Sequence, residues 1–304
     1  GTVGALSSLL DSGIVPLPVG NLCFLAKVEG SLRFGRWYWG LCSAAPALLQ
    51  AAQDNWARGL LGADPWRNPG TCRGELGWSL SSEALVAIDV ARMRAIFWHH
   101  SESSLAGLVF VRSHSMQGPN WAKLSLALLD KWGIPDWPVW HQLHGGSRQT
   151  YMRLVKHLLA EACVAPWSLV AFRHKAPIAY EELQSTPSDQ LSKMVALGAS
   201  WDVMLGVRSF CRMRCGLLQL GHKDRKLSQA SVQLCVACGI KSRSRHHHAL
   251  CDCAVFAAER QCAEIASVSF SSLSALNVRP GQPGFIEVVA LARKIEQTAW
   301  KFWH

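Results

Sequence analysis

The pattern that most restricts how this chain can fold is a group of cysteines and histidines toward its C-terminal end. Cys235 and Cys238 are separated by two residues and followed by Gly239. This arrangement is typical of a zinc-knuckle turn, in which both sulfurs face one ion and the glycine permits a tight backbone. His248 and Cys253, with four residues between them, can complete a tetrahedron if a helix begins directly after them. The pattern predicts a structural Zn²⁺ site with the ligands Cys235, Cys238, His248 and Cys253.

The sequence leaves the choice of ligands in the second pair open. His246 or His247 could replace His248, and Cys251 could replace Cys253. The alternative to a metal site is a set of reduced, partly buried thiols beside a solvent-facing run of histidines, but the second His/Cys pair favours the metal. Four protein ligands leave no open coordination position, so the ion would stabilise the fold, by about 10 kcal/mol or more, and would not catalyse a reaction.

Positive charge concentrates around the same stretch. The chain has 31 Lys and Arg against 21 Asp and Glu, a formal charge of +10, which indicates a polyanionic partner. Between Arg208 and Arg260, ten basic residues stand against three acidic ones, so this stretch carries +7 of the +10. The alternative is a solvated basic face without a partner. We expect contacts to the phosphates of RNA or DNA from three residues on a predicted helix and three in the loop between the ligand pairs, namely Arg208, Arg212, Arg214, Lys241, Arg243 and Arg245.

Composition excludes several classes of protein. Apolar residues make up 49% of the 304 residues and charged residues 17%, so the chain can bury a core and is neither disordered nor collagen-like. Eleven cysteines are too few for a small secreted disulfide scaffold, and Asp11 interrupts the first apolar run, so no signal peptide is predicted. No stretch has the length and apolarity of a membrane span. We expect an intracellular protein, in the nucleus or the cytoplasm, that is not secreted and has no membrane partner.

Hydrophobic periodicity predicts a mainly α fold. Apolar stripes and cap signals indicate helices over 44–61, from Ser81 or Ser82 onward, and over 121–132, 151–163, 254–266 and 285–303, with a helix pair over 190–220 broken near Gly206. Strand signals are few, the best being Leu108–Val111 and then Phe34–Trp39. We expect a helical bundle-like part over 1–190, a basic zinc-knuckle module over 191–266, and a linker with a C-terminal helix over 267–304.

The segments around the cysteines resemble a known arrangement. They are Arg212-Met-Arg214-Cys-Gly216, Leu234-Cys235-Val-Ala-Cys238-Gly239, His248-Ala-Leu-Cys-Asp-Cys253 and Phe256-Ala-Ala-Glu-Arg260. Together they are similar to the tail that follows the polymerase core in non-LTR retrotransposon reverse transcriptases. The earlier stretches Arg36–Gly40, Trp56–Gly62 and Glu75–Trp78 resemble the thumb and connection region of those enzymes, and residues 101–190 match nothing in the family.

The resemblance implies nucleic-acid binding without catalysis in this chain. Nine residues separate Cys238 from His248, which fits the retrotransposon tail better than a retroviral nucleocapsid knuckle. The chain contains no Asp-Asp pair, so the polymerase palm and its metal-binding aspartates are absent, and no catalytic residue is expected. We expect a fragment of an RNA-directed DNA polymerase whose polymerase core precedes Gly1. The alternative is a domesticated or decayed zinc-stabilised module for protein interaction.

One further motif interleaves cations with aromatic residues. The run Arg33-Phe34-Gly35-Arg36-Trp37-Tyr38-Trp39 has the composition of a stacking platform for single-stranded nucleic acid. A half-buried strand or helix whose tryptophans belong to the core is the favoured interpretation. The fourteen tryptophans of the chain have no account from the sequence alone.

Overall fold

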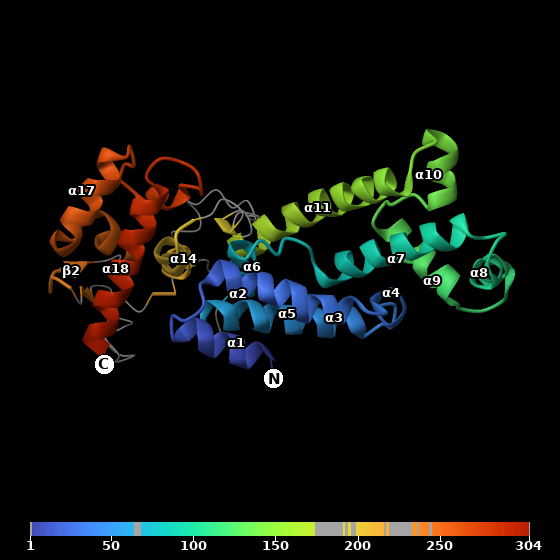
Figure 1. Cartoon of the computed structure of the whole chain (residues 1–304), viewed down its shortest axis with the longest axis horizontal. Helices are drawn as coiled ribbons and strands as arrows, with labels where there is room; N and C mark the ends of the chain where they lie inside the picture. The colour runs from blue at the N-terminus through green and yellow to red at the C-terminus, as the bar shows by residue number, and fades with distance from the viewer. Residues whose placement is uncertain are drawn as a thin grey trace. The chain divides into compact units, whose positions relative to one another are not determined.

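The computed structural model describes residues 2–303 except 64–67, 174–190, 192–193, 196–198, 216, 219–232, 236 and 243–244. The prediction of a mainly α fold is confirmed (Figure 1). The strands within the described ranges are β1 (Gln233–Leu234) and β2 (Lys241–Ser242), which pair antiparallel with Gln233 opposite Ser242. None of the helices in those ranges combines the length and the hydropathy needed to cross a bilayer.

The chain forms two compact units, and neither is a continuous segment. We call the first the knuckle unit; it comprises Gly1–Phe24, Trp56–Gly77 and Val170–His304. The second, the aromatic unit, comprises Leu25–Asn55 and Trp78–Leu169. The division therefore differs from the three consecutive segments expected from the sequence. The reason is that helices from both ends of the chain pack together in the knuckle unit, so the last helix is not a separate part.

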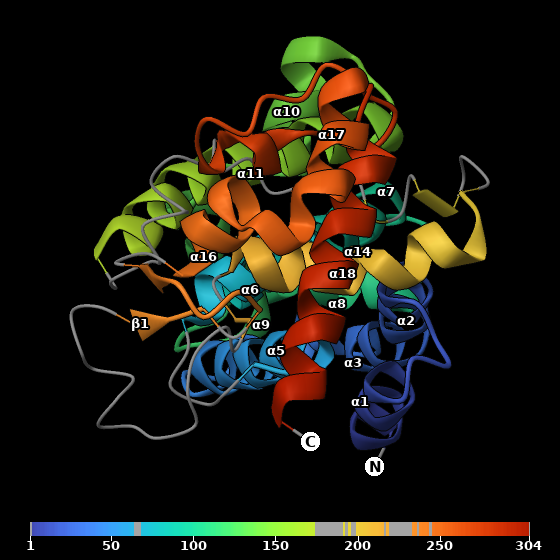
Figure 2. The ribbon, with the colours of Figure 1, turned by 90° about the vertical axis from the view of Figure 1, so that its left-hand side faces the viewer.

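Two long helices organise the knuckle unit. Helix α14 (Trp201–Arg214) packs along α18 (Phe285–Trp303), and Figure 2 shows the two helices crossing. At the crossing, a Cβ added to Gly206 would lie 2.6 Å from a methyl group of Val289. The predicted break near Gly206 is therefore wrong: α14 continues through this glycine because its missing side chain lets the helices approach closely. The other elements of the unit are α1 (Thr2–Asp11), α2 (Leu17–Phe24), α6 (Pro69–Glu75), α16 (Arg245–His247), η2 (His248–Asp252), η3 (Ala254–Phe256), α17 (Ala257–Ile265) and η4 (Leu273–Asn277).

The aromatic unit packs around α7 (Ser82–His99), which is buried along most of its length. The Ser81 hydroxyl caps this helix by accepting a hydrogen bond from the amide of Ala84 at 3.2 Å. Tryptophans fill the core on both sides: Trp37 meets Trp121 edge to face at 5.5 Å between ring centroids, and Trp137 meets Tyr151 in the same way at 5.5 Å. The remaining elements are η1 (Leu25–Glu29), α3 (Gly30–Arg33), α4 (Arg36–Trp39), α8 (Leu105–Ser115), α9 (Trp121–Lys131) and α10 (Trp137–His144), together with α5 (Ala45–Leu61) and α11 (Arg148–Arg173), which are both shared with the knuckle unit.

A buried ion pair links three helices of this core. Arg94 of α7 has no exposed surface, and its Nε donates to Asp136 Oδ1 at 2.9 Å while its Nη1 donates to Ser125 Oγ at 2.7 Å. Asp136 also accepts from the Trp98 indole at 3.1 Å and caps α10 through the amide of Trp137 at 2.9 Å. Because every charged group here is matched, the pair can remain inside the core.

Neither predicted strand is present, and helix or turn takes its place. Leu108–Val111 lies inside α8, where the Ser104 hydroxyl accepts from the Gly107 amide at 3.0 Å and so supplies a helix cap. A short apolar run does not distinguish helix from strand, and the cap decides between them. Phe34–Trp39 contains a turn at Gly35, whose φ is +69°, followed by the single helical turn of α4.

Candidate metal centre

Four side chains converge on one point in the knuckle unit. The ligand atoms of Cys235, Cys238, His248 and Cys253 all lie within 4.8 Å of one another. The sulfurs of Cys235 and Cys253 are 3.9 Å apart, and the Cys238 sulfur lies 3.1 Å from His248 Nε2. A tetrahedral ion with metal–sulfur bonds of about 2.3 Å requires sulfurs about 3.8 Å apart. The cluster therefore has the dimensions of a Cys₃His site and can hold one metal ion.

The first ligand pair is held by a tight turn between the two strands. The amide of Gly239 donates to the carbonyl of Cys235 at 2.9 Å, and the amide of Cys235 donates to the carbonyl of Ile240 at 2.9 Å. Gly239 has a φ of +72°, in the left-handed region that favours glycine. The glycine after the second cysteine is thus what allows both sulfurs to face the same side.

The second ligand pair is held by one turn of π-helix. In η2 the amide of Cys253 donates to the carbonyl of His248, five residues earlier, at 2.7 Å. This wider turn brings the two ends of a His-x₄-Cys sequence to one side. His247 instead directs its Nδ1 toward Asp252 Oδ2 at 3.1 Å. Of the candidates that the sequence left open, the structure places His248 and Cys253 in the cluster.

The site lies on an apolar base. Cys253 and Leu250 have no exposed surface, and Phe256 retains 1%. Burial, together with the smaller effect of the neighbouring Cys235 and Cys238 thiols, raises the pKa of the Cys253 thiol to about 12. Three sulfurs and one imidazole are a soft donor set, which suits Zn²⁺ better than Mg²⁺ or Ca²⁺. With all four positions supplied by the protein, such an ion would hold the two ligand pairs together and leave no place for a substrate.

The three arginines of α14, which we expected to contact phosphates, form internal ion pairs instead. Arg208 is 8% exposed and donates to Asp11 Oδ1 at 2.6 Å and to the carbonyl of Leu60 at 3.1 Å. Arg212 pairs with Glu296 of α18 at 2.7 Å. These arginines lie on faces of α14 that pack against other helices, so their charges stabilise the knuckle unit and are not presented to a nucleic acid.

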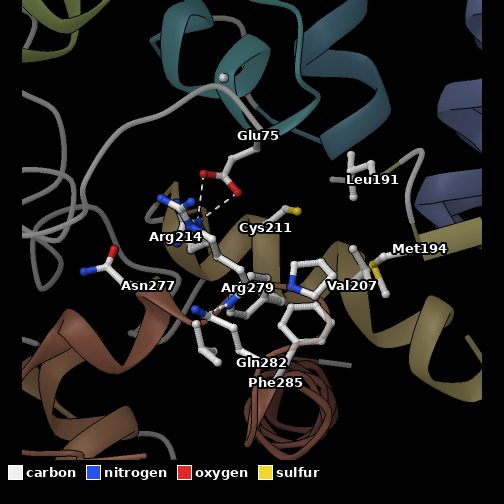
Figure 3. A pocket seen from close by; sticks show the side chains of 14 residues that line it. Glu75, Leu191, Met194, Val207, Cys211, Arg214, Asn277, Arg279, Gln282 and Phe285 are labelled. Carbon is white, nitrogen blue, oxygen red and sulfur yellow. Dashed lines mark hydrogen bonds and ion pairs between the residues drawn. The ribbon is translucent and has the colours of Figure 1, made fainter. Parts of the chain in front are cut away.

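Arg214 belongs to the same set and lines a cavity. Its Nε donates to both carboxylate oxygens of Glu75, at 2.9 and 3.0 Å (Figure 3). Its Nη1 donates to the carbonyl of Leu276. The adjoining cavity of about 250 Å³ is apolar on the side of Phe210 and Phe285. Burial raises the pKa of the Cys211 thiol in its wall well above the usual range, so this thiol is a packing group and a poor nucleophile.

The basic residues between the two ligand pairs are Lys241, Arg243 and Arg245, and the structure describes the side chain of Lys241 alone among them. Lys241 follows the knuckle turn on β2 and is exposed. Arg243 lies outside the described residues, and Arg245 begins α16 with a side chain that is likewise outside them. The predicted phosphate contacts of these three residues remain a prediction.

Sequence reasoning overlooked a group of exposed aliphatic side chains beside the ligands. Leu234 is 56% exposed, Ile240 55% and Val255 48%, each within two residues of a cysteine ligand. The sequence gives no sign of this exposure, because Leu, Ile and Val residues are ordinarily buried. Comparison with models of protein families, with curated proteins and with solved structures gives no match for the chain.

Proposed function

We propose that this chain is the nucleic-acid-binding C-terminal part of a non-LTR retrotransposon reverse transcriptase, with Zn²⁺ in the Cys₃His cluster. The observation that carries the proposal is the convergence of Cys235, Cys238, His248 and Cys253, whose ligand atoms all lie within 4.8 Å of one another. The nine-residue separation of Cys238 and His248 is that of the retrotransposon tail. The preceding arginine-bearing helix α14 agrees with the same arrangement, and so do the consecutive helices η3, with Phe256, and α17, with Arg260.

The proposed contact surface is narrower than the charge distribution suggests. Because Arg208, Arg212 and Arg214 have internal partners, binding would use Lys241, Arg243 and Arg245 in the loop between the ligand pairs. A metal ion that fixes both ends of this loop lowers the entropy lost when the cations meet phosphates. No catalytic residue is proposed; polymerisation would belong to a palm outside this chain.

Binding to a fluorescein-labelled single-stranded oligonucleotide, followed by anisotropy over a series of salt concentrations, tests the proposal. The triple variant Lys241→Ala/Arg243→Ala/Arg245→Ala is expected to lower the slope of log affinity against log salt by about 2, because each phosphate contact on a single strand contributes about 0.7. The matched control Arg148→Ala/Arg153→Ala/Lys156→Ala removes the same charge from an exposed face of α11 and is expected to change the slope by less. Equal slopes for the two triple variants would refute specific binding by the loop.

The exposed aliphatic residues favour a second candidate, a zinc-stabilised module that binds another protein. Leu234 and Ile240 beside the knuckle would then form the contact. If Leu234→Ala/Ile240→Ala abolishes capture of a protein partner while the basic triple variant leaves oligonucleotide binding unchanged, the second candidate replaces the first. A zinc content far below one ion per chain in protein purified under reducing conditions would contradict both.

A further inference from the structure

An aromatic side chain of the aromatic unit stands almost entirely in solvent. Phe34 is 89% exposed, the highest value for a large apolar side chain in the described part of the chain, and Tyr38 is 65% exposed. Both belong to the Arg33–Trp39 run in which aromatic residues alternate with cations. Trp39 of this run is half-buried. Trp37 packs against the core, as favoured from the sequence, and meets Phe97 and Trp121 edge to face. The phenylalanine and the tyrosine do not.

The backbone beneath these two rings is fixed. The indole of Trp39 donates to the carbonyl of Phe34 at 3.0 Å, and the amide of Tyr38 donates to the carbonyl of Gly35 at 2.8 Å. Gly35 takes a φ of +69°, and a Cβ there would lie 3.4 Å from the Trp39 ring. Because the turn that bears the rings is held in this way, its backbone loses little conformational freedom on binding.

Arginines accumulate beside this turn around a single buried carboxylate. Asp89 Oδ1 lies 3.3 Å from Arg33 Nε and 3.5 Å from Arg92 Nη1, and Asp89 Oδ2 lies 2.8 Å from Arg36 Nε. Glu29 pairs with Arg36 from the other side. Three guanidinium groups thus face two carboxylates, which leaves a surplus of one positive charge.

The surplus charge lies at the surface. The side chains of Arg33 and Arg92 are 48% and 36% exposed, whereas that of Arg36 is 5% exposed. Burial lowers the pKa of Arg92, and the positive charge of Arg33 lowers it further. An anion between these two guanidinium groups would relieve their repulsion, and both are close enough to the same Asp89 oxygen to reach one phosphate.

We propose that Arg33, Phe34, Tyr38 and Arg92 form a binding site for single-stranded nucleic acid, in which the two rings stack on bases and the two arginines contact the backbone. Single strands are the ligand that this chemistry fits, because unpaired bases expose the faces that aromatic rings cover and phosphates match the surplus charge. Duplex bases are already stacked on one another and cannot use the rings. The site lies in the aromatic unit and does not depend on the knuckle proposal.

The test measures the affinity of the intact chain for fluorescein-labelled 12-mers of deoxythymidine and of uridine and for a duplex of the same length. Phe34→Ala and Tyr38→Ala are each expected to weaken binding of the single strands by roughly 5- to 150-fold, since one stacked base is worth about that factor on alanine substitution, and to leave duplex binding unchanged. The two single strands separate RNA from DNA preference. Phe34→Trp should bind at least as tightly as wild type.

The matched control is Leu143→Ala, which removes a 73% exposed aliphatic side chain from α10 of the same unit. The effect of Phe34→Ala should persist in the Lys241/Arg243/Arg245 triple variant, which distinguishes this site from the loop of the knuckle unit. If Phe34→Ala and Tyr38→Ala bind single strands within twofold of the Leu143→Ala control, the proposal is wrong. It is equally wrong if Phe34→Ala only abolishes self-association or capture of a protein, because the rings are then a protein contact.

Discussion

Replacing Arg214 by methionine separates the two roles that this residue could have. The Arg214 side chain is 11% exposed and that of Glu75 is 8% exposed, so the substitution leaves a buried carboxylate without its guanidinium. Breaking a buried ion pair from one side costs about 3–5 kcal/mol. At roughly 2–4 °C per kcal/mol for a domain of a few hundred residues, the Tm of the knuckle unit should fall by roughly 6–20 °C.

The assay is thermal and urea unfolding followed by far-ultraviolet circular dichroism, with oligonucleotide affinity measured well below the lower Tm. Glu75→Met/Arg214→Met is expected to recover most of the lost stability, because apolar residues of similar volume often replace a buried pair without net cost. Folded Arg214→Met should bind the oligonucleotide within twofold of wild type.

The opposite result would refute the reasoning. If Arg214→Met unfolds at the wild-type temperature but binds the oligonucleotide several-fold more weakly, Arg214 contacts phosphate and its pairing with Glu75 is dispensable. The same outcome would support the expectation from the sequence that Arg214 contacts the phosphates of a nucleic acid.

Two further predictions concern the two units separately. Cys238→Ser should lose bound zinc, measured by mass spectrometry of the metal, and should lose protection of the 235–253 amides in hydrogen exchange. The control Cys262→Ser, at an exposed cysteine of the knuckle unit, should retain both the zinc and the protection. Equal zinc contents in the two variants would contradict the ligand assignment. Asp136→Asn should lower the free energy of unfolding of the aromatic unit by about 3–5 kcal/mol in urea, because Arg94 remains buried without its carboxylate. The control Asp130→Asn, at an exposed residue, should change the same free energy by less than about 1 kcal/mol. Similar values for both variants would show that the Arg94–Asp136 pair contributes little.

The parts of the fold that local chemistry determines were predictable from the sequence. The Cys-x-x-Cys-Gly turn needs a left-handed glycine, and Gly239 has one. The His-x₄-Cys spacing requires both ends on one side, but an ideal α-turn repeats every 3.6 residues, so the π-turn that achieves this was not foreseen. Helix α7 was predicted because Ser81 supplies a cap before an apolar run.

The errors over Arg208 and Gly206 came from interactions between residues far apart in the chain. From the sequence, Arg208 is expected to be a surface cation. In the structure it pairs with Asp11, which lies 197 positions earlier in the sequence. From the sequence, Gly206 is expected to break a helix. In the structure it is the point at which α18, through Val289, packs closely against α14. Composition and periodicity contain no information about which distant carboxylate will meet a given guanidinium, so the number of available cations was overestimated.

The placement of the tryptophans provides two optical signals within one chain. Four tryptophans of the aromatic unit lie in the packed pairs Trp37–Trp121 and Trp137–Trp140, and should emit at short wavelength. Trp201 and Trp300 of the knuckle unit are 51% and 62% exposed and should emit at longer wavelength. The shift of the emission maximum can therefore report the loss of the aromatic core during unfolding. Quenching by iodide can report the exposed tryptophans of the knuckle unit in the same sample, without an attached dye.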